Sequence, residues 1–176
     1  MKTMMTAAVV AVIGAGILLA ASQANAQSGK REDPVAKNLA TFDDLDFNVF
    51  TNQKWAELKH SHAKDILVHW PDGHTTTGLE VHITDLAAMF VYAPDTRITA
   101  HPVKFGSGEW TSVTGVMEGT FSKPMPIGDG KFIQPTGKSF KLPMATIGRW
   151  NKEGVMVEEF LFWDNQTFMK QLGLAQ

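Results

Sequence analysis

The chain has 176 residues, with 16 lysines and arginines against 18 aspartates and glutamates, and 44% of its residues are hydrophobic. Without a run of basic residues it lacks the electrostatic footprint of a protein that binds nucleic acid or an anionic membrane, and its hydrophobic content excludes a disordered chain. Its length is that of one ordinary domain, and the absence of cysteine excludes disulfides, so stability must come from the core.

The first 26 residues have the pattern of a cleaved export signal. Lys2 is their only charge, an apolar stretch runs from Ala7 to Ala21, and Ala24-Asn25-Ala26 fits a small-x-small cleavage site. The apolar stretch is short for a membrane span, so an uncleaved anchor is the less favoured alternative. The sequence therefore predicts a periplasmic or secreted protein with no membrane association after signal cleavage, and a flexible tail over residues 27–34.

Asp33 and Pro34 open the first predicted helix, as its N-cap and its first helical residue. Apolar side chains then recur at helical spacing as far as about Thr51. Three acids crowd the middle of this stripe, namely Asp43, Asp44 and Asp46. We expect these acids to form a solvated face rather than a metal site.

Asn52 is positioned to cap a second short helix, and His60 and His62 follow it as an H-x-H pair. In a helix these two histidines would lie about 200° apart, so both could bind one metal ion only from an extended segment. No HExxH motif and no obvious third ligand accompany them. The sequence therefore favours a protein without a metal site.

Residues 65–70, DILVHW, have the composition of a strand, which Pro71-Asp72-Gly73 ends with a turn. Alternation places His69 on one face of this strand and Trp70 on the other. Histidine has an unperturbed pKa of ~6.5 and is the natural proton carrier at neutral pH. His69 is therefore a candidate acid or base, and equally a candidate hydrogen-bonded residue of the core or rim.

Thr77 can cap a helix from about Gly78 to Tyr92, whose buried stripe ends in Met89 and Phe90. These last two side chains could line a cavity, although residues of this kind more often belong to the core.

The second half of the chain is almost continuously strand-like. Thr96–Phe105 and Glu109–Phe121 are expected to pair as a hairpin. Lys123–Thr136, rich in proline and glycine, is predicted to be an irregular excursion and a mobile rim. Residues 137–150 return as a strand in which Pro143 indicates a bulge or a sheet edge. Helices followed by a long antiparallel meander and a terminal helix predict an α+β fold.

The last predicted strand, Gly154–Trp163, is largely apolar on both faces, and we expect it to be covered on both sides. Alternation puts two sets of side chains on opposite faces: Met156, Glu158, Phe160 and Phe162 on one, and Val157, Glu159, Leu161 and Trp163 on the other. Burial of an unpaired carboxylate is costly. At least one of Glu158 and Glu159 should therefore be paired, lie at a rim or have a raised pKa, with Arg149 among the expected partners of Glu158.

Asp164 follows this strand and precedes the segment NQTFMKQLG. Its position is that of a helix N-cap, which we favour over a catalytic role for the same carboxylate.

Motifs near the C-terminus occur in a fixed order: Pro135-Thr136-Gly137-Lys138, Arg149, Gly154–Phe160, Asp164 and Gln171-Leu172-Gly173. Together they resemble the closing motifs of the SnoaL-like (polyketide cyclase-like, ester cyclase-like) family of the nuclear transport factor two-like superfamily. The resemblance spans roughly residues 35–174, which we take as the domain. It implies a curved antiparallel sheet that forms a cone, N-terminal helices packed on it, a short C-terminal helix, a small apolar ligand in the open end, and a homodimer.

The resemblance also bears on the site, because such cyclases and isomerases typically work with one acid/base residue and without metal or organic cofactor. Their acid/base aspartate aligns with Leu161, which cannot transfer a proton, and Met117 stands where a histidine often occurs. His69-Trp70-Pro71 is similar to a QHNP-like segment of the family. The candidate catalytic residues are therefore Glu159, which shares a strand face with Leu161, then His69 and Asp164. Candidate pocket walls, which core packing would explain equally well, are Trp70, Phe90, Trp110, Met117, Leu161 and Trp163.

Two hypotheses follow from the sequence. The first is an exported lyase, isomerase, cyclase or ester-hydrolysing enzyme that acts on a small apolar carbonyl or ester compound, with Glu159 or His69 as base. The second is a non-catalytic module of the same fold that binds a small ligand or dimerises through its sheet. A buried Glu159 with a raised pKa and access to a pocket favours the first, and a Glu159 satisfied by arginine or backbone amides favours the second.

Overall fold

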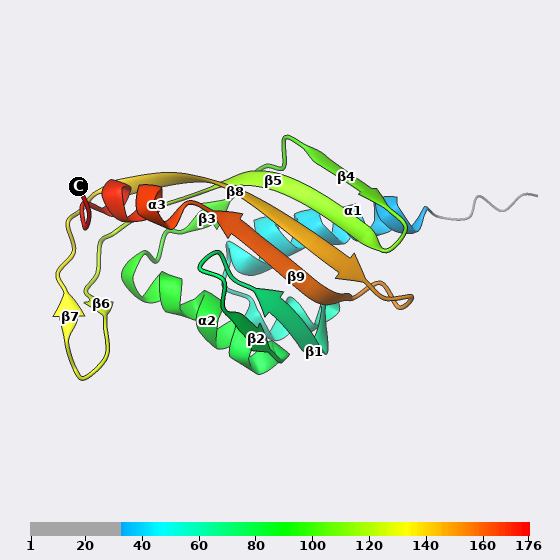
Figure 1. Ribbon diagram of the computed structural model, residues 1–176, viewed down its shortest axis with the longest axis horizontal. Coiled ribbons are helices and arrows are strands. Elements are labelled where there is room, and N and C mark those ends of the chain that lie inside the picture. The colour runs from blue at the N-terminus through cyan, green and yellow to red at the C-terminus, as the bar shows by residue number, and fades with distance from the viewer. Residues whose placement is uncertain (1–32) are drawn as a thin grey trace, which may run out of the picture. The chain divides into compact units, whose positions relative to one another are not determined.

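The computed structural model describes residues 33–176 and has an α+β fold, as predicted (Figure 1). The expected export signal and nearly all of the expected tail lie outside the described residues. Within residues 33–176, no helix is long and apolar enough to cross a membrane.

The N-terminal helices follow one another with little interruption. Helix α1 (Pro34–Asp44) begins as predicted, because the Asp33 carboxylate accepts a hydrogen bond from the Val35 amide. It continues into the π-helix η1 (Leu45–Phe50), and the 3₁₀ helix η2 (Trp55–His60) follows. The predicted Asn52 cap of the second helix is wrong. The Asn52 side-chain amide donates instead to the Asn48 carbonyl oxygen in the last turn of η1, and η2 begins after Lys54 without a side-chain cap.

A seven-stranded curved sheet forms the body of the fold, with the strand order β2-β1-β9-β8-β5-β3 and with β4 also paired to β5 (Figure 1). The strands are β1 (His62–His69), β2 (Thr75–Thr77), β3 (Arg97–Ile98), β4 (Lys104–Ser107), β5 (Trp110–Thr120), β8 (Ser139–Trp150) and β9 (Met156–Trp163). All pairs are antiparallel except β1 with β9, which run parallel. The first strand of the chain is thus paired directly with the last, beyond the simple antiparallel meander that the sequence predicts.

The helices cover one face of this sheet and leave the other open. Side chains of α1, η1 and α2 (Leu79–Tyr92) form a hydrophobic core with the inward-facing residues of β1, β5, β8 and β9. The outward face of β9 is not covered, since Phe162 is 49% exposed. The expectation of cover on both faces is therefore wrong for this strand.

A β-bulge in β9 changes which side chains share a face. Glu158 lies opposite Arg149, but the next pair in the register is Met156 with Trp150, so Val157 is the extra residue. Strict alternation would place Met156 beside Glu158 on the outer face. The bulge turns Met156 inward, where it is fully buried in the same core as Leu161.

Pro143 lies in β8, which is central in the sheet but has only one strand partner at that point. It pairs with Val116 of β5 without a register shift, and β9 joins β8 only from Met144 onward. The prediction of a local sheet edge is confirmed there, because proline has no amide hydrogen to donate. Just beyond, the side chain of Gln171 in α3 (Asn165–Leu172) hydrogen-bonds both backbone groups of Lys141.

The proline- and glycine-rich segment after β5 forms a small separate hairpin of β6 (Met125–Pro126) and β7 (Phe132–Ile133). It projects away from the main sheet (Figure 1).

Candidate functional site

An internal cavity of about 90 Å³ lies between the helices and the concave face of the sheet. Its walls are mostly apolar, with a small group of polar side chains. The apolar lining residues are Leu45, Phe50, Trp70, Leu86, Met89, Ile98, Met117, Met144, Leu161 and Trp163, and the polar ones are Asp46, His62, His82, Asp85, Thr146 and Glu159. A cavity with apolar walls and few convergent polar groups is the usual form of a small-molecule site.

Three of the polar side chains meet at one point of the wall. Glu159 of β9 is 4% exposed, and its Oε2 lies 3.2 Å from Nε2 of His82 in α2 and 3.6 Å from Nε2 of His62 in β1. Both histidines are 2% exposed, and their rings are 5.2 Å apart between centroids. We refer to these three residues as the His–Glu–His cluster.

The cluster keeps Glu159 ionised. Burial by itself raises the pKa of this carboxyl, but the neighbouring His62 and His82 imidazoles lower it by more, so the pKa lies well below its usual range. The raised pKa that would mark Glu159 as a proton-accepting base is therefore not found. Its partners are histidines rather than the arginine or backbone amides that an inert role would require.

Local structure explains how two distant histidines reach Glu159. The Met156 amide donates to the Ser61 carbonyl oxygen, which fixes the start of β1 beside β9 and turns His62 inward. Gly78, with φ of +104°, makes the turn from β2 into α2, a conformation that other residues rarely adopt. Its carbonyl oxygen accepts the His82 amide, so His82 lies in the first turn of the helix.

Asp85 lies one helical turn after His82 and lines the same cavity. Its Oδ2 is buried, and within residues 33–176 no hydrogen bond reaches it. A carboxylate oxygen in that position is available to a ligand or a proton.

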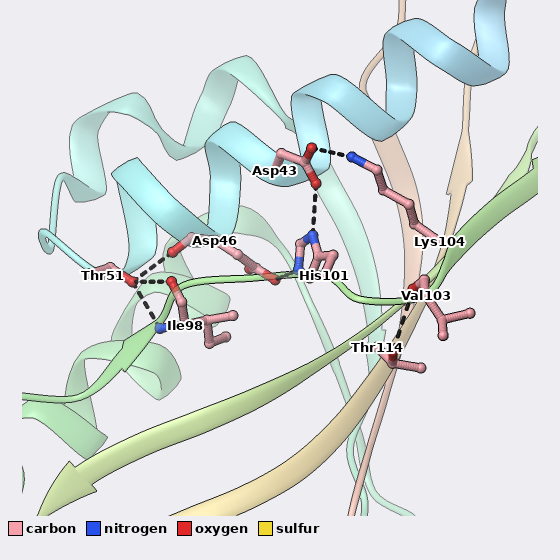
Figure 2. A network of polar contacts seen from close by, with 8 residues as sticks. All are labelled: Asp43, Asp46, Thr51, Ile98, His101, Val103, Lys104 and Thr114. Atoms are coloured by element: carbon pink, nitrogen blue, oxygen red, sulfur yellow. Dashed lines mark hydrogen bonds and ion pairs between the residues drawn. The ribbon is translucent and has the colours of Figure 1, made fainter.

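A second polar network adjoins the cavity from the side of η1 (Figure 2). His101 is buried between two carboxylates, with Nε2 2.8 Å from Asp46 Oδ2 and Nδ1 2.9 Å from Asp43 Oδ1. Asp43 also contacts the Lys104 ammonium at the surface. Hydrogen bonds thus join Asp46, His101, Asp43 and Lys104 into one network that runs from the cavity wall to solvent (Figure 2).

The expectation that the acids of the first helix form a solvated face is wrong for Asp46, which is 7% exposed. Burial raises the pKa of Asp46, although His101 opposes the shift. Burial lowers the pKa of His101, but Asp46 and Asp43 raise it by more, so the net shift is upward. Asp46 lies in the π-helix η1, whose wider turn places its side chain toward the core. A regular period of 3.6 residues does not predict this orientation.

The three predicted catalytic residues lie in three different places, and only Glu159 lines the cavity. His69 is on the outer face of the sheet, where its Nε2 is 3.0 Å from Glu158 Oε1. Its ring stacks on the Phe160 ring, with 3.9 Å between the two centroids. Arg149 completes this outer group with Nε 2.9 Å from Glu158 Oε2, as expected for Glu158. Asp164 accepts a hydrogen bond from the Thr167 amide and is the N-cap of α3, the role that the sequence favours.

Four of the six predicted wall residues line the cavity, namely Trp70, Met117, Leu161 and Trp163. Phe90 is buried and packs against Phe50 and Trp55, but it is not one of the residues that line the cavity. Trp110 is 41% exposed, because it is one of the β5 residues whose side chains point to the outer face. There the Arg149 guanidinium lies 5.9 Å from the centroid of its ring. Phe90 thus has the core role that the sequence left open, and only the placement of Trp110 corrects the sequence-based expectation.

Sequence reasoning missed His82, Asp85 and Asp46 as site residues, and considered His62 only as a metal ligand. A signal for His82 exists, because it lies three residues after Leu79 and four before Leu86, on the apolar stripe of α2. A histidine on a buried stripe must find a partner. Its partner, Glu159, is 77 residues away in the sequence, and helical spacing does not identify it.

Comparisons with known proteins agree on the fold. The family model of the SnoaL-like polyketide cyclases matches residues 44–172. None of the curated proteins matches the sequence significantly.

Solved structures with the same fold are similar over most of the chain. A candidate SnoaL-like polyketide cyclase from Jannaschia sp. CCS1 is 17% identical, with a TM-score of 0.70 over 84% of this chain and 100% of that one. IdmH, a candidate polyketide cyclase from Streptomyces antibioticus, is 23% identical, with a TM-score of 0.64 over 77% and 98% of the two chains. AclR, a candidate hydroxylase from Streptomyces galilaeus, is 13% identical, with a TM-score of 0.65 over 81% and 99%. At these identities the likeness shows the fold alone.

The environment of His101 predicts a pH dependence of stability. Because the pKa of His101 is raised in the folded state, its stabilising contribution is fully present below the unfolded value of 6.5 and is lost as the pH rises through the folded value. We expect the ring proton signals of His101 to titrate above pH 6.5 in NMR spectra. The free energy of unfolding should fall across that window in the native protein but not in a His101→Gln variant. A titration of His101 below pH 6.5 would contradict this assignment.

Proposed function

Because the chain belongs to the SnoaL-like polyketide cyclase family, we propose that its cavity is the active site of a lyase, isomerase or cyclase acting on a small, largely apolar carbonyl or ester compound. One observation carries the proposal: the buried His–Glu–His cluster and the unpartnered Asp85 oxygen open into the same apolar cavity. Such a juxtaposition of proton donors and acceptors in a water-poor pocket suits proton transfer beside a carbonyl group.

Asp85 and His82 divide the chemistry between them in this proposal. Asp85, whose Oδ2 accepts no hydrogen bond within residues 33–176, would take a proton from the carbon next to the substrate carbonyl. The electron pair left by that proton moves onto the carbonyl oxygen and forms an enolate. His82, once protonated, would donate from Nδ1 to this oxygen, while the ionised Glu159 stabilises the ring from the other side.

Three outcomes are open to such an enolate, and they define the reaction class. Return of the proton to another atom gives an isomer, expulsion of a β-substituent gives an elimination product, and attack of the enolate carbon on a second carbonyl closes a ring. All three need only a base and a group that stabilises the oxyanion, which the cavity offers.

The size and walls of the cavity limit the substrate. A cavity of about 90 Å³ is well below the ~300–1,000 Å³ of ordinary small-molecule pockets, so only a small part of a larger ligand fits without movement of the walls. Met89, Met117 and Met144 line the cavity, and methionine is the side chain most able to repack around a ligand. We therefore expect a compact apolar substrate whose carbonyl group enters first.

A non-catalytic ligand-binding module is the second candidate function. Leu161 lines the cavity at the position where the motif alignment places the acid/base aspartate of the better-known cyclases. Loss of that group favours a protein that binds a ligand without transforming it. The two functions differ in whether any member of a carbonyl panel is consumed.

We further propose that the protein is a homodimer that pairs through the outer face of its sheet. Apolar side chains gather there on three neighbouring strands, and several are substantially exposed. They include Trp110, Val116, Ile147, Phe160 and Phe162. An exposed apolar face of this kind usually marks a contact with another protein.

Asp85→Asn tests the proposed chemistry. The variant keeps the size of the side chain but removes the base, so we expect turnover of any substrate found among small lactones and β-keto esters to fall by about 10²- to 10⁴-fold. Ligand binding, followed by NMR shifts of the cavity methionines, should persist. Asp65→Asn, which changes an exposed carboxylate of β1, is the matched control and should leave turnover unchanged. Equal turnover by Asp85→Asn and the native chain would overturn the role of Asp85.

Phe162→Lys tests the dimer. Placing a charge in the middle of the outer face should convert the dimer to a monomer, measured by light scattering after size-exclusion chromatography. Phe132→Lys changes an aromatic residue of similar exposure on the β6–β7 hairpin and should leave the mass unchanged. A monomeric native protein would contradict the proposal.

Export is the remaining proposal, and the pattern of the first 26 residues supports it. Protein recovered from the periplasm or medium of an expressing bacterium should begin at Gln27 when its N-terminus is sequenced. Recovery of an intact N-terminus in the cytoplasm alone would argue against it.

A further inference from the structure

We propose that the His–Glu–His cluster binds one divalent transition-metal ion, with zinc as the best-fitting example. The ion would be held by Nε2 of His62, Nε2 of His82 and a carboxylate oxygen of Glu159, at the wall of the cavity. This inference deepens the proposed function, since it places a Lewis acid in the same site beside Asp85.

The spacing of the three donor atoms fits one ion. All three lie within 4.8 Å of one another, and the two nitrogen-to-oxygen distances are 3.2 and 3.6 Å. Ligand atoms at ~2.0–2.1 Å from a tetrahedral zinc ion are about 3.3–3.4 Å apart, which lies between these values. Two of the three separations therefore already fit one ion, and the third, between the two nitrogens, is at most 4.8 Å.

The hydrogen bonds around His62 favour a cation between the donor atoms. The Ser61 hydroxyl oxygen lies 3.0 Å from the Leu58 carbonyl oxygen and 2.9 Å from Nδ1 of His62, and when the hydroxyl donates to Leu58 it accepts the hydrogen of Nδ1. In the neutral ring Nε2 is then a lone pair, and it faces the Glu159 carboxylate at 3.6 Å. Two acceptors that face each other in the core repel unless a proton or a metal ion lies between them.

Neither atom of this facing pair has another use in the described part of the chain. His62 Nε2 and Glu159 Oε2 are both buried and make no hydrogen bond within residues 33–176. His82 Nε2, at 3.2 Å, is within ion-pair distance of the same oxygen but outside hydrogen-bond geometry. Convergence of buried, unpartnered donors on one point is the arrangement expected of a metal site, in which the Ser61 hydroxyl would orient the His62 ring.

The charge of the cavity wall also favours a bound cation. Asp46 is already paired with His101, but Asp85 and Glu159 add two more carboxyl groups to the wall, where the histidines are His62 and His82. Buried carboxylates need compensation by paired positive charge or metal coordination. A divalent ion at the cluster would supply that compensation.

Donor type and position define the class of ion. Two imidazole nitrogens and one carboxylate suit zinc or iron(II) and disfavour magnesium and calcium, which prefer oxygen ligands. The cavity on the open side of the cluster leaves room for a further ligand, such as a substrate carbonyl oxygen. When bound there, the ion would polarise that carbonyl and so assist proton removal by Asp85.

Metal titration of the untagged full-length protein tests this inference. After removal of metal with a chelator, calorimetric titration with Zn²⁺ should show one strong site per chain, and Mg²⁺ should show none. Titration with Co²⁺ should produce the visible absorption bands of a low-coordinate site. His82→Gln and Glu159→Gln should each weaken Zn²⁺ binding by at least about 100-fold.

The outer face of the sheet offers a matched control. His69 and Glu158 form another histidine–carboxylate pair, at 3.0 Å, and His69→Gln should leave the zinc stoichiometry and affinity unchanged. Circular dichroism and thermal melts establish that each variant is folded. If a cluster variant fails to fold, NMR of the native protein decides, because Zn²⁺ should shift the ring signals of His62 and His82 but not those of His69.

Three results would overturn the inference: absence of stoichiometric Zn²⁺ binding, Zn²⁺ binding that survives Glu159→Gln in a folded protein, or cluster histidine signals that Zn²⁺ does not move. Failure of the metal site and failure of the proposed function are distinguishable. Turnover that persists in the chelator-treated protein rejects the metal alone, whereas stoichiometric Zn²⁺ binding without turnover of any carbonyl compound rejects the proposed reaction alone.

Discussion

The buried Glu159 carboxylate, held between two histidines, is the interaction on which the site depends. An ionised carboxylate in the core is costly unless positive or hydrogen-bonding partners meet it, and removing one partner from a buried pair typically costs about 3–5 kcal/mol. Here the partners come from β1 and α2, so the position of the first strand and the first turn of the second helix are both tied to β9. The same contacts place the donors and acceptors at the cavity.

Two irregularities of the backbone make this meeting possible. A register shift between His62 and Leu67 in the β1–β9 pair allows His62 to turn inward at the start of its strand, and the bulge at Val157 turns Met156, the register partner of His62, inward. Bulges re-aim side chains and are common beside functional sites. Alternation along β9 then leaves one histidine–carboxylate pair inside the cavity, at Glu159, and one outside, at Glu158.

The Asp46–His101–Asp43–Lys104 network is a second polar network at the cavity, and it links the cavity wall to solvent (Figure 2). Both ring nitrogens of His101 face carboxylates, so with both acids ionised the ring must be an imidazolium. The negative charge of Glu159 also raises the pKa of Asp46. The two networks are therefore electrostatically coupled, and a change of charge in one alters proton affinity in the other.

Local pattern and spacing in the sequence were enough to predict the α+β class, the capped start of α1 and the N-cap role of Asp164. They also predicted that Glu159 and Leu161 share one face of their strand. Trp70, Met117 and Trp163 were among the candidate walls from the sequence, and Arg149 was among the candidate partners of Glu158. Which histidines meet Glu159 depends on the three-dimensional packing, since His62 reaches it through a parallel strand pair and His82 through a helix packed across the sheet. That packing also moved His69 and Trp110 to the outer face and Asp46 into the core. Alternation tells which residues of one strand share a face, but the partner of a buried charge is set by strand pairing and helix packing over long sequence separations, and no local period carries that information.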